Sequence, residues 1–368
     1  MKGRLSKVTQ VPPDEPLGSH VLELEVAEVV EETEDARSVV FTVPAGAEVA
    51  AERLRYAPGQ FLTLRIPSDR TGSVARCYSL CSSPFTDDAL TVTVKRTADG
   101  YASNWLCDHA HKGMRIHVLA PSGTFVPKTL DADFLLIAAG SGITPMMSMT
   151  TWAWDSGEMP DIVFVHAART PSDIIFRQRL EGMADRVPGL QLRFTVEEGD
   201  PFRTWHGYQG RLNQIMLGLM APDYLEREVF CCGPEPFMQA VRDMLVALGF
   251  DMEHYHQESF GAPIRNEAEA PVIEDVVPDE DARAEITFAV SGVTAKCHET
   301  DTVLAVAKAN GLNIPSGCTF GLCGTCKIRK TDGEVHMVHN GGISDEDIEE
   351  GYILACCSHP IGAISVEV

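Results

Sequence analysis

The chain has 368 residues, and since domains average roughly 150 residues, this length predicts two or three domains. Apolar residues make up 44% and charged residues 23% of the chain, which excludes a largely disordered protein and is typical of globular domains. No run of apolar residues is long enough to predict a membrane-spanning helix, and the first residues lack the apolar segment of a signal peptide. We therefore expect a cytoplasmic protein that binds no membrane.

The charge balance is strongly acidic. Asp and Glu number 53, Lys and Arg number 30, and the formal net charge is −23. A surface of this sign repels polyanions, so we expect neither nucleic acid nor anionic lipid as a partner. The acidity is compatible with solubility alone or with docking onto a basic protein surface.

Residues 17–127 have the pattern of an antiparallel β-barrel. Short runs that alternate between apolar and polar residues recur here, separated by turns that contain Pro and Gly. The expected strands are Val21–Val29, Arg37–Val43, Gln60–Ile66, Val74–Leu80, Leu90–Arg96 and Met114–Leu119. One helical stretch, near Ser103–His111, interrupts them.

The pattern changes to alternating strands and helices in residues 128–262. Continuous apolar runs predict strands that are buried on both faces, as in a parallel sheet. The expected strands are Phe134–Ala138, Ile162–Ala167, Gln191–Val196 and Glu228–Cys232. A helix capped by Ser172 or Asp173 is expected after the second strand, and another follows Pro236. We therefore predict a doubly wound α/β domain with a parallel sheet.

A charged segment separates this domain from the last one. Residues 263–283 include seven acidic residues, and Pro271 and Pro278 interrupt the segment. This composition predicts an extended acidic linker. Residues 284–368 then form a smaller third domain.

Cysteines in the third domain have a diagnostic spacing. Cys318-x4-Cys323-x2-Cys326, followed by Cys356, is the pattern of plant-type [2Fe–2S] ferredoxins. A zinc site would favour a second C-x2-C pair, for which the adjacent Cys356 and Cys357 are too close. We predict Cys318, Cys323, Cys326 and Cys356 as the cluster ligands. The flanking residues also resemble plant-type ferredoxins, which implies an α+β domain of the β-grasp fold.

Cys356 and Cys357 compete for the fourth ligand position. If both lie on one strand, their side chains face opposite sides, so only one of them reaches the cluster. Plant-type ferredoxins have about 30 residues between the third and fourth ligands, which selects Cys356. We expect Cys357 to face away from the cluster.

Four segments of the barrel region carry a second set of motifs. They are Tyr56–Phe61, Arg76–Ser79, Gly100–Asn104 and Pro121–Phe125. Together they resemble the ferredoxin–NADP reductase superfamily, across residues 20–260. The resemblance implies an FAD-binding barrel in which Arg76 pairs with the flavin phosphate, Tyr78 packs on the isoalloxazine and Ser79 bonds near N5. A guanidinium fits phosphate bidentately, and the helix opened by Gly100 and Ser103 would receive the pyrophosphate.

The same resemblance extends into the α/β domain. Gly140-x-Gly142-x-x-Pro145, which includes Thr144, is similar to a dinucleotide-binding loop after a strand. The second strand is followed by Arg169, where an acid would bind the ribose of NAD. Arg169 could face the 2′-phosphate of NADPH or form an ion pair with Asp173. Because the oxygenase-partner reductases that the chain resembles mostly use NADH, we expect NADH.

Two further segments complete the predicted catalytic site. By the resemblance, Cys232-Gly233-Pro234 contacts the nicotinamide, with Cys232 on the hydride path; a buried apolar role is the alternative for Cys232. Glu258 and Phe260 would end the reductase part beside the flavin, although Glu258 could equally be a surface carboxylate. The predicted catalytic residues are Ser79, Cys232 and Glu258.

The three predicted domains together indicate an electron-transfer chain. A nicotinamide delivers two electrons as a hydride, a [2Fe–2S] cluster carries one, and a flavin converts between them. The domain order resembles reductases that serve monooxygenases, and residues 94–106 and 257–261 resemble the reductase components of glycine betaine monooxygenases. We therefore expect an NADH-dependent reductase that supplies a partner Rieske-type oxygenase, in glycine betaine demethylation.

Several alternatives share part of this pattern. Reductases of hybrid-cluster proteins and of steroid, aromatic or other quaternary-amine hydroxylases have the same plan. A redox-sensing binding module would require an output domain, and a stand-alone oxidase or ferric reductase would not need the ferredoxin domain. The chain is not the oxygenase itself, because the C-x-H motifs at Cys107 and Cys357 are not followed by the C-x-x-H of a Rieske centre.

Overall fold

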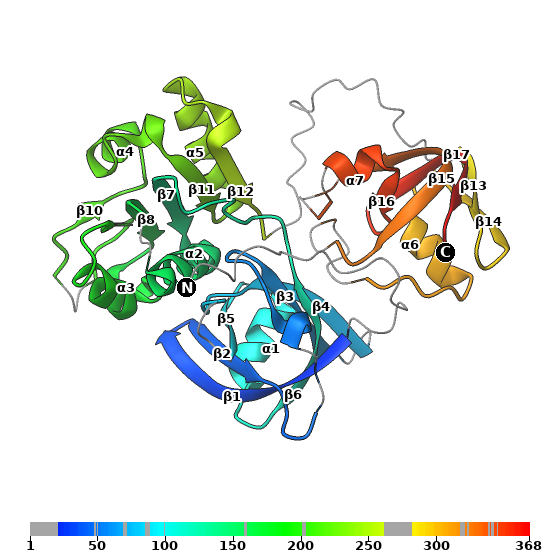
Figure 1. Cartoon of the computed structure of the whole chain (residues 1–368), viewed down its shortest axis with the longest axis horizontal. Coiled ribbons are helices and arrows are strands. Elements are labelled where there is room, and N and C mark those ends of the chain that lie inside the picture. The colour runs from blue at the N-terminus through cyan, green and yellow to red at the C-terminus, as the bar shows by residue number, and fades with distance from the viewer. Residues whose placement is uncertain are drawn as a thin grey trace.

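The computed structural model of the chain contains three sheets, each in its own lobe (Figure 1). The residues it describes are 21–47, 49, 51–68, 72–84, 89–98, 100–157, 160–200, 204–260, 282–316, 321, 324–337, 339, 342–343 and 345–368. We call the lobes the barrel module, the parallel-sheet module and the C-terminal module. No helix among these residues is long and apolar enough to span a membrane. The predicted linker, 263–283, lies almost entirely outside the described residues.

The barrel module is an antiparallel sheet in the strand order β4-β3-β6-β1-β2-β5. Its elements are β1 (Val21–Thr33), β2 (Ala36–Thr42), η1 (Ala51–Leu54), β3 (Phe61–Ser68), β4 (Gly72–Ser79), β5 (Leu90–Lys95), α1 (Tyr101–His109) and β6 (Arg115–Ser122). A bridge between Leu80 and Val92 joins the two edges of the sheet. The predicted antiparallel barrel is thereby confirmed, and alternate strand residues such as Leu22, Leu24 and Val26 fill its core.

The parallel-sheet module has the strand order β10-β9-β8-β7-β11-β12, and all its described pairings are parallel. Its elements are β7 (Phe134–Ala139), η2 (Gly140–Gly142), α2 (Ile143–Ser156), β8 (Ile162–Ala168), η3 (Pro171–Asp173), α3 (Arg177–Ala184), β9 (Leu190–Val196), β10 (Tyr208–Gln209), α4 (Gln214–Met220), η4 (Tyr224–Glu226), β11 (Glu228–Cys232), α5 (Glu235–Ala247), η5 (Met252–His254) and β12 (Tyr255–Glu258). The four predicted strands are confirmed, whereas β10 and β12 were not predicted.

Helices cover both faces of this sheet. Every residue of β7 is buried. Leu136 and Ala138 pack on one face with residues of α2 and α3, and Leu135 and Ile137 pack on the other with residues of α4 and α5. The continuous apolar run therefore reflects a strand that is buried on both sides.

The helix after β8 begins later than the sequence predicts. Thr170, rather than Ser172 or Asp173, caps the short turn η3, in a capping box with Asp173. The helix α3 then starts at Arg177, after Phe176 in a left-handed conformation with φ 58°. The expected cap was wrong because Asp173 serves the preceding turn.

The C-terminal module is a mixed sheet in the order β14-β13-β17-β15-β16, in which β13 and β17 are parallel. Its elements are β13 (Arg283–Phe288), β14 (Val293–His298), α6 (Val303–Ala309), β15 (Lys327–Met337), α7 (Asp345–Glu349), β16 (Tyr352–Leu354) and β17 (Ser358–Val366). Its buried core contains only residues from 284 onward. This sheet, with its short helices, confirms the predicted α+β ferredoxin fold.

Candidate functional site

The order in which strands are added to the parallel sheet reverses between β7 and β11. The glycine loop, which follows β7, lies at this point. In doubly wound sheets, ligands bind at the carboxyl ends of the strands where the order reverses. A Cβ on Gly142 would lie 2.1 Å from the carbonyl oxygen of Cys232 and 2.6 Å from the backbone nitrogen of Gly233. Glycine is required at 142 because these two segments approach so closely. The structure thus brings together the two predicted nicotinamide motifs, which are 90 residues apart in the chain.

Three predicted catalytic residues lie together beside the Gly142 loop. Cys232 on β11 is the register partner of Glu258 on β12. The Ser79 hydroxyl, at the end of β4, donates a hydrogen bond to Oε2 of Glu258 at 3.2 Å. Ser79 is 3% exposed, Cys232 0% and Glu258 5%. The alternative that Glu258 is a surface carboxylate is therefore wrong.

Burial determines the protonation of these groups. It raises the pKa of Glu258 to about 8, although the hydrogen bond from Ser79 acts in the opposite direction. Burial also raises the pKa of the Cys232 thiol well above its ordinary value, with a further contribution from the charge of Glu258. At neutral pH, Glu258 is a neutral carboxylic acid and Cys232 a neutral thiol. Such buried groups are shielded from water, and a protonated Glu258 carboxyl is able to donate a proton.

Arg76 and Tyr78 precede Ser79 on β4. Arg76 is exposed, and Tyr78 is partly buried against the barrel core. Burial raises the pKa of Tyr78, and the charge of Arg76 opposes this effect. The two residues are two positions apart on β4, so their side chains lie on the same face of the strand. An exposed guanidinium beside a fixed aromatic ring suits a group that combines a phosphate with a planar ring system.

The loop before α1 contains the predicted pyrophosphate residues. A Cβ on Gly100 would lie 2.7 Å from Oγ of Ser103 and 2.9 Å from Cβ of Thr97. The Ser103 hydroxyl accepts a hydrogen bond from the backbone nitrogen of Thr97 and donates one to the carbonyl of Gly100, both at 3.2 Å. Ser103 therefore shapes the loop, and the amides at the start of α1 are the groups that fit a pyrophosphate.

The loop at η2 has the geometry expected of a dinucleotide site. Gly140 has φ +53°, and its carbonyl contacts Nε2 of His166 at 3.3 Å. Burial lowers the pKa of His166 to about 4, so this histidine is neutral. The Thr144 hydroxyl donates to the carbonyl of Ser141 at 3.0 Å, and Pro145 lies in the first turn of α2, where no intrahelical bond is lost. His166 was not among the predicted site residues.

The remaining predicted contacts are at the ends of β11 and β12. A Cβ on Gly233 would lie 3.0 Å from Cβ of Ala139 and 3.0 Å from Cδ1 of Phe237, so a larger residue would require these side chains to shift. Pro234 precedes α5 as its N-cap residue. Phe260, two residues after Glu258, is 37% exposed and thus able to cover a ligand.

Two of the four predicted cluster ligands lie in the described part of the chain. Cys326 and Cys356 are 2% and 7% exposed and share the core of the C-terminal module. The backbone nitrogen of Cys356 donates to Sγ of Cys326 at 3.4 Å. Backbone donors that face cysteine sulfur fit a thiolate ligand of an iron–sulfur cluster. Cys318 and Cys323 lie outside the described residues.

Cys356 and Cys357 are not on a strand. They lie in the turn between β16 and β17, so the expected alternation of their side chains was based on the wrong local structure. The Cys357 sulfur lies 2.8 Å from the point where a Cβ on Gly321 would be placed. Cys357 therefore packs against Gly321, and this glycine, with φ +74°, provides the space.

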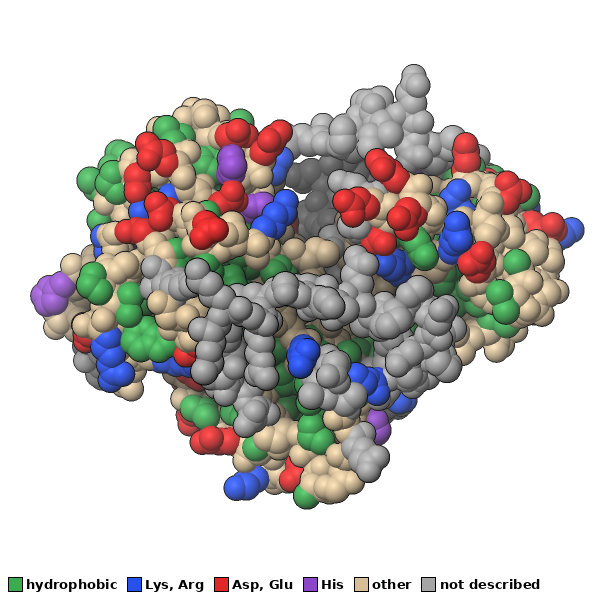
Figure 2. Space-filling model, in the orientation of Figure 1, with side chains coloured by type: hydrophobic (Ala, Val, Ile, Leu, Met, Phe, Trp, Pro, Cys, Tyr) green, Lys and Arg blue, Asp and Glu red, His purple; other side chains and the backbone are tan. Residues whose placement is uncertain are grey.

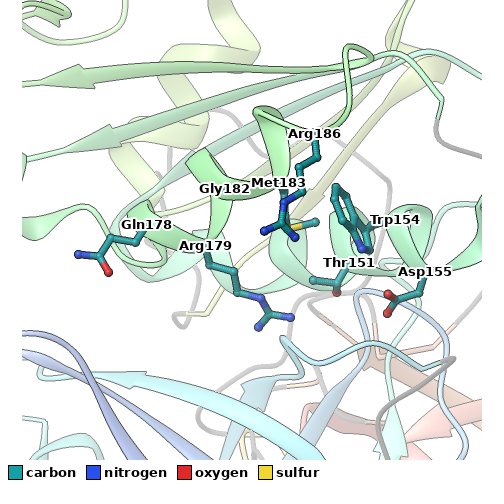
Figure 3. Close-up of a pocket in the computed structure, with 8 residues that line it drawn as sticks. All are labelled: Thr151, Trp154, Asp155, Gln178, Arg179, Gly182, Met183 and Arg186. Atoms are coloured by element: carbon teal, nitrogen blue, oxygen red, sulfur yellow. The ribbon is translucent and has the colours of Figure 1, made fainter.

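A separate pocket of about 390 Å³ lies between α2 and α3 (Figure 3). Its lining residues are Thr151, Trp154, Asp155, Gln178, Arg179, Gly182, Met183 and Arg186. None of these lining residues is one of the predicted site residues. The predicted site residues at Gly142 and Cys232 therefore lie outside this pocket.

Three family models match successive parts of the chain. Residues 23–126 match the oxidoreductase FAD-binding domain, residues 136–243 the oxidoreductase NAD-binding domain, and residues 286–360 the 2Fe-2S iron-sulfur cluster binding domain. These matches confirm the predicted cofactor domains: FAD, a nicotinamide nucleotide and a [2Fe–2S] cluster.

Relatives match over nearly the whole chain. The stachydrine N-demethylase reductase subunit of Rhizobium meliloti is 56% identical, covering 93% of this chain and 96% of the relative. The ferredoxin reductase component of 3-ketosteroid-9-alpha-monooxygenase from Mycolicibacterium smegmatis is 53% identical, covering 96% and 98%. The glycine betaine monooxygenase reductase subunit of Chromohalobacter salexigens is 42% identical, covering 92% and 93%.

The fold is also similar to that of phthalate dioxygenase reductase, with a TM-score of 0.58 and 24% identity, covering 95% of this chain and 98% of that structure. The order of the modules, the family matches and these relatives agree with one another. The chain belongs to the three-module reductases of the ferredoxin–NADP reductase superfamily, NAD(P)H-dependent oxygenase reductase components with a C-terminal [2Fe–2S] ferredoxin domain.

Proposed function

We propose that the chain oxidises NADH at the Ser79–Cys232–Glu258 site and supplies single electrons, through its ferredoxin domain, to a Rieske-type oxygenase. Bound flavin supplies the step between two-electron and one-electron chemistry. The observation that carries the proposal is the contact between modules: a buried Ser79 from the barrel donates to Glu258, which is paired with Cys232 on the parallel sheet.

Each residue has a role that follows from its position. Gly140, Gly142 and Thr144 shape the loop that receives the nucleotide, and the close approach of Gly142 to Cys232 fixes the nicotinamide end. Cys232, a neutral thiol, orients the nicotinamide ring by contact. Glu258 holds a proton at Oε1 or Oε2 and, with Ser79, places it near the hydride acceptor. Hydride transfer needs such fixed geometry, because small displacements are costly.

Arg76, Tyr78 and the start of α1 would hold the flavin. Arg76 binds its phosphate, Tyr78 packs on the ring, and the loop of Gly100 and Ser103 presents backbone amides to the pyrophosphate. Phe260 covers the opposite side. Cys318, Cys323, Cys326 and Cys356 would bind the cluster.

For the partner's substrate, we propose a betaine, a carboxylate that carries a quaternary ammonium group. Stachydrine and glycine betaine both have this chemistry, and the reductase for stachydrine is more similar to this chain, at 56% identity, than the reductase for glycine betaine, at 42%. Stachydrine therefore ranks above the glycine betaine that the sequence motifs favoured. A 3-ketosteroid is the second candidate, because its reductase is 53% identical.

The experiment is a reconstitution with the Rieske-type oxygenase of the same organism. The purified chain, the oxygenase and NADH are incubated with stachydrine, glycine betaine or a 3-ketosteroid. N-demethylation of a betaine releases formaldehyde, which is measured, and steroid hydroxylation is followed by mass spectrometry. Formaldehyde from stachydrine is the expected result. Steroid hydroxylation without demethylation would contradict the betaine proposal, and failure to reduce any one-electron acceptor with NADH would contradict the whole proposed function.

A further inference from the structure

Asp35 lies in the turn between β1 and β2 of the barrel module, but its side chain also contacts the parallel-sheet module. Its carboxylate accepts hydrogen bonds from Nζ of Lys95 at 2.5 Å and from Nη2 of Arg169 at 2.8 Å. The Thr33 hydroxyl donates to it at 2.9 Å. Burial raises the pKa of Asp35, but the contacts from Lys95, Thr33 and Arg169 outweigh this effect and hold the pKa below its ordinary value. One charged acid thus neutralises a cation from each module.

Both cations belong to, or directly follow, strands that contact the dinucleotide loop. The strand β5, which ends at Lys95, packs against η2, the Gly140–Gly142 turn. The charge of Lys95 also acts on His166, the side chain that contacts the carbonyl of Gly140. Arg169 directly follows β8, the second strand of the doubly wound sheet, where this architecture binds the ribose of the adenosine half.

A second acid, from the same module as Arg169, also binds its guanidinium. Nη2 of Arg169 lies 3.1 Å from Oδ1 of Asp173. Asp173 is itself fixed, because its Oδ2 accepts the backbone N–H of Thr170 at 3.2 Å. The exposed Glu198 follows the neighbouring strand, and its backbone nitrogen bonds to the carbonyl of Arg169 at 2.8 Å. The guanidinium next to the ribose position is therefore already bound by two carboxylates, with a third acid close by.

These contacts discriminate between the two nicotinamide cofactors. The 2′-phosphate of NADPH carries nearly two negative charges and needs free cations. To bind Arg169 or Lys95 it must displace Asp35 and Asp173, or lie against them. A 2′-hydroxyl meets no such repulsion. Specificity is obtained here by opposing the wrong ligand rather than by attracting the right one.

We propose that Asp35 and Asp173 make the ribose site selective for NADH, and that Asp35 has the larger effect because it holds both Lys95 and Arg169. The inference rests on the proposed function, in which the nicotinamide nucleotide binds at the carboxyl ends of β7 and β8. It assigns a specificity-determining residue of the nucleotide site to the barrel module.

The test uses Asp35→Asn, Asp173→Asn and wild type as full chains loaded with FAD and cluster. Glu34→Gln is the matched control, because Glu34 is the exposed neighbour of Asp35 in the same turn and its loss changes the net charge equally. Calorimetry measures the dissociation constants of AMP and adenosine 2′,5′-bisphosphate, which differ only by the 2′-phosphate. The ratio of kcat/KM for NADPH and NADH, with ferricyanide as acceptor, is the second readout.

We expect Asp35→Asn to shift both ratios toward the 2′-phosphorylated ligand by about threefold to tenfold, in line with the modest energies of exposed ion pairs. Asp173→Asn should cause a smaller shift and Glu34→Gln none. An unchanged ratio in Asp35→Asn would overturn the proposal, as would equal tightening of AMP and the bisphosphate or an equal shift in Glu34→Gln. Wild-type chain that oxidises neither cofactor would instead contradict the proposed function.

Discussion

The barrel and parallel-sheet modules share a core, whereas the C-terminal module has its own. Ala36, Cys81 and Phe125 of the barrel pack in one apolar cluster with residues of α2 and the parallel sheet. The core of the C-terminal module holds only its own residues. Hydride transfer requires the nicotinamide and the flavin to be held in fixed contact. Electron transfer to a partner protein requires the C-terminal module to be accessible to that partner. The difference in packing matches this difference in chemistry.

Polar contacts reinforce the first interface. Ser79 donates to Glu258, Ser148 of α2 donates to the carbonyl of Ser82 at 3.2 Å, and Arg169 donates to Asp35. Two of these three bonds involve residues of the proposed hydride or ribose site. In the proposed function, the interface between the two modules therefore also forms part of the site.

Loss of a cluster ligand should give the largest difference between the activity of the flavin-binding modules and that of the C-terminal module. We expect Cys356→Ser to abolish the rhombic electron paramagnetic resonance signal of the reduced cluster and to slow cytochrome c reduction by at least about 100-fold. Ferricyanide reduction, which draws on the flavin, should persist. Cys357→Ser is the matched control and should keep its cluster. A normal signal in Cys356→Ser with loss in Cys357→Ser would show that the ligand assignment is wrong.

Removal of the buried acid should impair the hydride site alone. We expect Glu258→Gln to slow flavin reduction by NADH about 100-fold, because a positioned proton donor contributes this much or more. The pKa of Glu258 is about 8, so below that pH the carboxyl keeps its proton and above it the site gains a buried negative charge. Wild-type flavin reduction should therefore slow as the pH rises through about 8.

This pH dependence should be absent in Glu258→Gln. Stopped-flow absorbance between pH 6 and pH 10 measures both effects, with the cluster spectrum as the check on folding. A variant that retains the same decline near pH 8 would assign that decline to another group.

Truncation of the thiol should have a smaller effect on the same step. We expect Cys232→Ala to slow flavin reduction about tenfold, since it removes a positioning contact but no charge or proton donor. The spectra of the flavin and the cluster should stay as in wild type. Stopped-flow reduction at the wild-type rate would leave Cys232 with a packing role only.

The smallest expected effect concerns the acidic surface of the C-terminal module. Residues 284–368 contain 11 acids and five Lys or Arg, and Figure 2 shows acidic side chains gathered over α7. Glu346, Glu349 and Glu350 are exposed there. Substituting these three by Gln should slow transfer to the oxygenase a few fold at low salt, and added salt should reduce the difference, because exposed charges are screened over about 8–10 Å.

A matched control carries the same loss of charge on the parallel-sheet module. Asp185→Asn, Glu226→Gln and Glu253→Gln remove three exposed acids far from α7 in the chain. Equal slowing in both triple variants would mean that net charge, rather than the surface over α7, steers the partner.

The sequence predicts the three folds well because their patterns are local. Alternating strands, fully apolar strands and clustered cysteines each have a distinct period or spacing. It misses β12, because Tyr255-His256-Gln257-Glu258 has neither an apolar run nor a regular alternation. That strand places Glu258 beside Cys232, so the burial of Glu258 follows only from the tertiary structure.

Long-range ion pairs were also missed. Asp173 was predictable as a partner for Arg169 because it is four residues away, whereas Asp35 is 134 residues away and on another module. The local structure at Cys357 was also mispredicted, because residues 355–357 form a turn between β16 and β17 rather than part of a strand.

Anaerobic stopped-flow of the full chain with NADH tests the central claim most directly. Diode-array spectra separate the flavin and cluster bands after rapid mixing. If hydride enters at the Ser79–Cys232–Glu258 site and electrons leave through the ferredoxin domain, the flavin band should bleach first and the cluster band second. Flavin reduction should be about 100-fold slower in Glu258→Gln, and cluster reduction should be lost in Cys356→Ser. Cluster reduction at the wild-type rate in a variant whose flavin is no longer reduced would contradict the account.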